Sequence, residues 1–221
     1  MSNRTQFDEQ LVSLKEKLLE MVYQSKHAID QSIIALQSQD LELAKLIISQ
    51  DKEINELEKE INDIVIRNIV KQQPVASDLR RLMVAVKISS DIERVGDLAV
   101  NIAKSTLFIG KEPFHTSTDA IPQMAKVVQK MLSDSLTAYH EENIQSAYSI
   151  ASTDDTVDRM YGETIQYLLA QMALRPDAVP QLTQLAFICR YLERVGDHVT
   201  NIAENIIYLV KGERIDLNFQ V

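Results

Sequence analysis

The sequence predicts an all-α protein made of two tandem three-helix bundles, with six long antiparallel helices that arise from an internal duplication. Three observations support this fold class. Glycine and proline number only five each among 221 residues, too few for the turns that a β-protein of this length needs. Apolar residues recur at alternating steps of three and four over long stretches, as in bundle helices. The segment ERVGD occurs twice, at 93–97 and 193–197, which indicates duplication.

The first half of the chain contains three helix-forming stretches. The first begins near Phe7 and follows a seam of apolar and small side chains at heptad spacing, which is typical of a bundle helix. This seam consists of Phe7, Leu11, Leu14, Leu18, Met21, Ser25, Ala28, Ser32 and Ala35. The second helix is expected over about 40–71, with Asp40 as its N-cap and Pro74 beyond its end. The third is expected from Ser77 until Gly110 ends it.

The second half repeats this plan after a polar linker. The stretch GKEPFHTSTD changes composition between the halves. The expected organisation is therefore a first bundle at 1–110, a linker at 111–119 and a second bundle at 120–221. Helices are expected over about 120–141, 144–174 and 179–210, with Gly212 beyond the last of them.

Composition and charge narrow the function classes. The net charge of −9 disfavours nucleic-acid binding, which needs a cationic surface. The single cysteine, Cys189, permits no internal disulfide and suits a reducing compartment. The N-terminal residues lack the apolar core of a signal peptide, and no apolar run approaches the roughly 20 residues of a membrane span. We therefore expect a cytoplasmic protein that reaches membranes only through its partners.

Oxygen-bearing side chains recur at helical spacing in both halves. In the repeated segment, Glu93 and Asp97 lie four residues apart and share one helix face, and Asn101 extends the row by another turn. The second copy of this row is Glu193, Asp197 and Asn201. The helix before each row carries a matching pair, Asp51 with Asn55 in the first half and Asp154 with Asp158 in the second.

These rows predict a metal site in each half. Antiparallel helices joined by short loops can place the two rows of one half face to face, so that four oxygen-bearing side chains converge. Hard or borderline cations such as Mg²⁺, Mn²⁺ and iron accept oxygen-rich ligand sets. Without a cation, two like charges at this spacing cost on the order of a few tenths of a kcal/mol. We therefore predict that these rows bind metal.

A glycine stands at the same position of both copies. Gly96 and Gly196 lie within helical stretches, where glycine costs about 1 kcal/mol relative to alanine. The repetition suggests that bulk is excluded at this position, either by the backbone of a neighbouring helix or by a bound ligand.

Other interpretations stay open. Charged residues at helical spacing usually form a solvated face, which Arg94 and Arg194 could neutralise, and the glycines also fit tight packing without metal. A carboxylate-bridged metalloenzyme is a further alternative, although no helical Glu-x-x-His pair accompanies the acids. A purely structural helical interaction module is another. Because the sequence contains no recognisable nucleophile or general-base motif, we expect a protein that is not an enzyme.

Two segments carry a resemblance to a known family. PVASDLRRLMVAVKISSDIERVGDLAVNIAK and LERVGDHVTNIAEN closely resemble the PhoU family, and the resemblance covers essentially the whole chain. It implies a fold of two similar three-helix bundles. It also implies a negative regulator of phosphate uptake and of the phosphate-starvation response. As an adaptor, such a protein would link the ATPase subunit of the phosphate ABC transporter to a membrane sensor histidine kinase. A homodimer is expected.

The resemblance further implies a cofactor. Some members of the family bind multinuclear iron or other metal clusters at the repeated acidic motifs. Divalent or trivalent ions are therefore expected here, with iron, Zn, Mn, Mg and Ni as candidates. This chain departs from strict symmetry, because Asn55 stands where the second half has Asp158, and Asp78 and Arg80 have no counterpart. The first site should therefore bind metal less tightly than the second.

Overall fold

Six long helices make up the chain in a computed structural model, which describes residues 3–217 and the side chains of 7–217. They are α1 (Asn3–Ser38), α2 (Leu41–Gln72), α3 (Ser77–Ile109), α4 (Ala120–Glu141), α5 (Ile144–Leu174) and α6 (Val179–Lys211), with a short 3-10 helix, η1 (Pro176–Ala178), before α6. Residues 3–217 contain no strand, so the all-α prediction is confirmed. The outermost residues of the predicted bundles, 1–2 and 218–221, lie outside the described residues.

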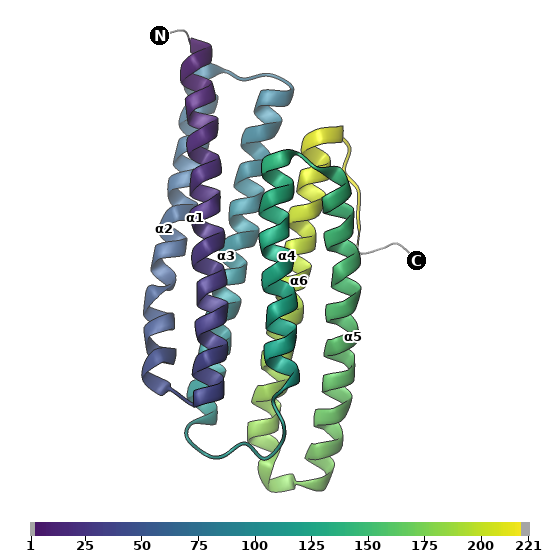
Figure 1. Cartoon of the computed structure of the whole chain (residues 1–221). Helices are drawn as coiled ribbons and strands as arrows, with labels where there is room; N and C mark the ends of the chain where they lie inside the picture. The colour runs from purple at the N-terminus through teal and green to yellow at the C-terminus, as the bar shows by residue number, and fades with distance from the viewer. Residues whose placement is uncertain (1–2, 218–221) are drawn as a thin grey trace.

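The helices form two antiparallel three-helix bundles that lie side by side (Figure 1). Helices α1, α2 and α3 pack together, as do α4, α5 and α6. The two bundles meet along their lengths, because α3 packs against α6 and α1 packs against α4. Helices α3 and α6 therefore lie at the centre of the molecule. The sequence alone allowed an end-to-end arrangement as well.

One apolar core runs through both bundles. It includes Leu18 of α1, Ile88 of α3, Leu132 of α4 and Leu192 of α6, each at most 1% exposed. No helix among the described residues is long and apolar enough to cross a membrane. Some large apolar side chains nevertheless stay exposed, among them Tyr23, Val70 and Leu174.

Local chemistry sets the helix ends. Asp40 begins α2, because its carboxylate accepts hydrogen bonds from the backbone N–H groups of Glu42 and Leu43, both at 3.0 Å. Gly110 and Gly212 end α3 and α6 with φ angles of 72° and 78°, a region that favours glycine. Residues 73–76 join α2 to α3, and residues 175–178 join α5 to α6. Because these connections are short, each pair of helices is antiparallel, and this fixes which of their turns face each other.

Candidate metal centres

The second half brings four predicted acids to one hollow between α5 and α6. Asp154 and Asp158 come from α5, and Glu193 and Asp197 come from α6. The hollow measures about 540 Å³. We call it the α5–α6 acid hollow. Its other lining residues are Tyr148, Ala151, Ser152, Asp155 and Leu217.

Two of these acids are buried, and each has an oxygen without a hydrogen-bond partner. Asp154 and Glu193 are 6% and 9% exposed. Oδ2 of Asp154 accepts a hydrogen bond from the hydroxyl of Thr200 at 2.9 Å, whereas Oδ1 of Asp154 and Oε2 of Glu193 are buried without a partner. A buried polar group left unpaired costs about 1–3 kcal/mol, and more when it is charged. Binding of a cation or of protons to these carboxylates would therefore stabilise the folded protein.

Burial and mutual repulsion act on the protonation of these acids. Burial raises the pKa of Asp154 to about 6, and neighbouring carboxylates contribute to the shift. Burial and the nearby Asp197 raise the pKa of Glu193 to about 7, although Arg190 opposes this shift. Burial and Asp197 also raise the pKa of Asp158. Asp154 and Glu193 thus resist carrying their full negative charge near neutral pH.

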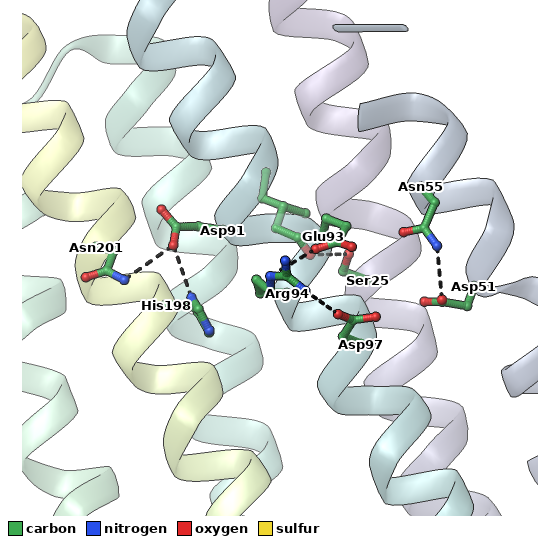
Figure 2. Close-up of polar contacts among 10 residues, drawn as sticks. Ser25, Asp51, Asn55, Asp91, Glu93, Arg94, Asp97, His198 and Asn201 are labelled. Atoms are coloured by element: carbon green, nitrogen blue, oxygen red, sulfur yellow. Dashed lines mark hydrogen bonds and ion pairs between the residues drawn. The ribbon is translucent and has the colours of Figure 1, made fainter. Parts of the chain in front are cut away.

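The first half places the corresponding side chains between α2 and α3 (Figure 2). Asp51 and Asn55 lie on α2, with the Asn55 amide donating to Oδ2 of Asp51 at 3.2 Å. Glu93 and Asp97 lie on α3. The pKa of Asp51 and that of Glu93 are both raised, first by burial and then by repulsion from Asp97. The three acids of this half therefore lie close enough to influence one another.

The arginines beside the two sites come from different positions. Arg94 pairs with both acids of its helix, at 3.4 Å from Glu93 and 2.9 Å from Asp97 (Figure 2). In the second half the paired cation is Arg190, which forms an ion pair with Glu193, whereas Arg194 is exposed. The acids of the first site are therefore more fully neutralised by protein side chains than those of the second.

Different side chains donate a hydrogen bond to the corresponding aspartates of the two halves, Asp51 and Asp154. In the first half the donor to Asp51 is the amide of Asn55. In the second half Asp158 stands in place of Asn55, and the donor to Asp154 is Thr200. Valine stands at the matching position 100 of the first half. Sequence analysis missed Thr200 and Arg190, because neither belongs to a pattern that repeats in both halves.

The structure explains the repeated glycine. A Cβ atom at Gly196 would collide with Oδ1 of Asp154. At Gly96 it would lie 2.9 Å from Cδ1 of Ile54 and 3.6 Å from Oδ1 of Asp51. A side chain of the facing helix, rather than its backbone, thus occupies the space that the missing Cβ leaves.

The two asparagines that extend the acidic rows do not both join them. Nδ2 of Asn201 donates to Oδ1 of Asp91 at 3.3 Å, across the contact between α6 and α3, where Nδ1 of His198 lies 3.0 Å from the same oxygen (Figure 2). The amide of Asn201 is turned toward α3, and Asn201 is not among the residues that line the α5–α6 acid hollow, so its predicted role as a metal ligand stays untested. Asn101 is half-buried on α3, and its predicted role as a ligand stays a prediction.

The donor set fits a hard cation in its chemistry. It consists of carboxylate and amide oxygens, and three oxygens of the predicted side chains, on Asn55, Asp154 and Glu193, are buried without a partner. In the conformation seen here, no three His, Cys, Asp or Glu side chains within the described residues stand close enough together to hold an ion. A bound cation would have to draw the carboxylates inward.

Comparison with known protein families places both halves in one family of domains. The model of the PhoU domain matches residues 18–106 and 121–206. The chain is 42% identical over 213 residues to the phosphate-specific transport system accessory protein PhoU homolog of Clostridium acetobutylicum, which covers 96% of this chain and 97% of that protein. It is 32% identical over 208 residues to the phosphate-specific transport system accessory protein PhoU of Escherichia coli strain K12, which covers 94% of this chain and 86% of that protein.

Solved structures agree with these sequence relatives. The crystal structure of PhoU from Pseudomonas aeruginosa superposes with a TM-score of 0.89 at 32% identity, covering 94% of this chain and all of that one, 100%. The phosphate transport system regulatory protein PhoU from Streptococcus pneumoniae superposes with a TM-score of 0.87 at 32% identity, covering 95% and 99% of the two chains. The side-by-side pair of three-helix bundles is thus a shared fold.

The raised pKa values predict how the stability of the metal-free protein depends on pH. Asp154 and Glu193 have unfolded-state values near 3.8 and 4.5 and folded values of about 6 and about 7. The folded state therefore holds protons that the unfolded state has lost, so these groups reduce the free energy of unfolding as pH rises from about 4 to about 7. Asp154→Asn combined with Glu193→Gln should remove this loss and raise the free energy of unfolding at pH 7 by at least about 1 kcal/mol.

Urea unfolding of chelator-treated protein at several pH values measures this difference. Asp30→Asn combined with Glu213→Gln is the matched control, because it removes the same formal charges from exposed positions. The prediction would be contradicted if the free energy of unfolding depended on pH equally in the wild type and in the Asp154–Glu193 variant.

The glycines predict opposite effects for two alanine substitutions. Gly162 lies within α5 with nothing within 4 Å of an added Cβ, so Gly162→Ala should stabilise the helix by up to about 1 kcal/mol. Gly196→Ala should destabilise the protein by about 1–3 kcal/mol, because Asp154 must move from its buried position and its bond to Thr200. Both effects are measured as changes in the free energy of unfolding. Equal stabilisation by the two substitutions would show that the close approach of Asp154 to Gly196 does not affect the free energy of unfolding.

Proposed function

The chain belongs to the PhoU family, and on that premise we propose that it is a non-enzymatic regulator that restrains phosphate uptake and the phosphate-starvation response. The observation that carries this proposal is full-length similarity: relatives named phosphate-specific transport system accessory proteins align with 94–96% of the chain. The duplicated acidic rows on the same two-bundle fold support it. The partners proposed are the ATPase subunit of the phosphate ABC transporter and a sensor histidine kinase.

An adaptor role fits the shape and surface of the molecule. The two bundles expose long helical faces (Figure 1), and rigid faces of this kind suit docking to other proteins. We propose that the protein works in the cytoplasm, as a homodimer, and meets the membrane only through these partners. A carboxylate-bridged metalloenzyme is less well supported, because no histidine lines the α5–α6 acid hollow.

The acidic rows are proposed to bind divalent or trivalent metal ions. In the second half the proposed ligands are Asp154, Asp158, Glu193 and Asp197, and in the first half they are Asp51, Asn55, Glu93 and Asp97, with Asn101 beside them. A bound cation would compensate the buried carboxylates and hold the facing helices together. The second site should bind more tightly, because the first has one acid fewer and an arginine that pairs with two of its carboxylates.

The regulatory role is tested with the partners and in the cell. The purified chain should capture the transporter's ATPase subunit and the cytoplasmic part of the sensor kinase from the same organism, in pull-downs with purified components. Deleting the gene should derepress phosphate-starvation genes in phosphate-rich medium. Repression that persists after deletion would contradict the proposed function.

The metal sites are tested by elemental analysis of protein purified without a metal-chelating tag. Asp154→Asn with Glu193→Gln should abolish binding in the second half only, and Asp51→Asn with Glu93→Gln in the first half only. Titration of the chelator-treated variants with Mn²⁺ and Fe²⁺ should show at least tenfold tighter binding when the second site is the intact one. Loss of both sites in either variant would show that the two halves do not bind metal separately.

A further inference from the structure

A second polar hollow lies where α3 meets α6, on the part of the contact nearest the end of α6. It measures about 400 Å³ and shares no lining residue with the α5–α6 acid hollow. We call it the α3–α6 hollow. The side chains that matter for its chemistry are Lys87 and Asp91 of α3, Glu204, Asn205 and Tyr208 of α6, and Arg214 just beyond α6.

Three cationic side chains gather around one aromatic ring at this hollow. Nζ of Lys87 lies 5.9 Å from the ring centre of Tyr208, Cζ of Arg214 lies 5.5 Å from it, and Cζ of Arg80 lies 5.6 Å from it. Cation–π attraction holds each of them at the ring. The positive charges of these side chains nevertheless repel one another, so the cluster favours an anion.

Lys87 and Arg214 line the hollow, whereas Arg80 does not. Arg80 donates to the carbonyl oxygen of Leu209 at 3.4 Å, at the carboxyl end of α6. Lys87 and Arg214 form no ion pair with any carboxylate among the described side chains. The hollow thus contains two cations that form no ion pair with its acids, in a chain with a net charge of −9.

The acids of the hollow are held by other groups. Oδ1 of Asp91 lies 3.0 Å from Nδ1 of His198 and accepts a hydrogen bond from Asn201 at 3.3 Å (Figure 2). Oε1 of Glu204 accepts from the backbone N–H of Leu217 at 2.8 Å. Each of these contacts uses one oxygen of the carboxylate. The other oxygen can still accept a hydrogen bond from a ligand. The hollow therefore has a cationic end and an end rich in hydrogen-bond acceptors.

A hollow with cations at one end and hydrogen-bond acceptors at the other suits a ligand that carries both an anionic group and hydroxyl groups. Lysine and arginine together bind phosphate through charge-assisted hydrogen bonds, and the volume exceeds that of a phosphate group alone. We propose that the α3–α6 hollow binds a small phosphate ester, whose phosphate contacts Lys87 and Arg214 and whose hydroxyl groups donate to Asp91 and Glu204. The inference does not rest on the proposed function, since it uses only the residues of this hollow.

Isothermal titration calorimetry of the full chain tests the proposal. Glucose 6-phosphate, adenosine monophosphate, inorganic phosphate and glucose are the probes. Chelator-treated protein is used, so that no cation in the acid hollow can recruit phosphate. At least one ester should bind saturably and at least tenfold more tightly than inorganic phosphate, and glucose should not bind. Absence of saturable binding by both esters, or equal affinity for the esters and inorganic phosphate, would overturn the proposal.

Variants assign the binding to the hollow. Lys87→Gln combined with Arg214→Gln should weaken ester binding at least tenfold. Lys71→Gln combined with Lys126→Gln, which removes two exposed cations elsewhere, should leave it unchanged. Glu204→Gln should weaken ester binding and spare any binding of inorganic phosphate. Circular dichroism checks that each variant is folded. Undiminished binding in the Lys87–Arg214 variant would overturn the proposed site.

Discussion

Both candidate metal centres depend on the close approach of two antiparallel helices at a glycine. At Gly196 the facing helix inserts Asp154 into the space that a Cβ would fill, and at Gly96 it inserts Ile54, with Asp51 at ordinary contact distance. This approach buries carboxylates beside other carboxylates, which raises their pKa and leaves oxygens unpaired. The large apolar core that runs through both bundles supplies the stability that makes such unfavourable burial tolerable.

The duplication repeats the positions of the two sites but not their chemistry. Asn55 and Arg94 neutralise or satisfy the acids of the first half, so that much of its charge is balanced by the protein itself. In the second half Thr200 and Arg190 each contact one acid, while a further aspartate takes the place of the asparagine. Two sites of similar geometry thus differ in charge, which is the property that governs cation affinity most directly.

Helices α3 and α6 connect these sites to each other. Each carries an acidic row on the face toward α2 or α5, and each contributes to the contact between the bundles (Figure 1). Asp91, on the opposite side of α3 from the first site, meets His198 and Asn201 of α6 (Figure 2). The two candidate metal centres and the α3–α6 hollow are therefore built on the same two central helices.

Local patterns were enough to predict the six helices, their approximate ends and the repeated acidic rows, because heptad spacing, capping residues and the ERVGD repeat are all visible in short stretches of sequence. The sequence also indicated from Gly96 and Gly196 that something approaches closely. The side-by-side arrangement of the bundles, by contrast, depends on how the folded helices pack, as does the hydrogen bond from Asn201 to Asp91. The α3–α6 hollow and the contacts of Thr200 and Arg190 likewise depend on this packing. These features arise from contacts between helices distant in the sequence, and no periodicity within one helix specifies which of its faces meets which neighbour.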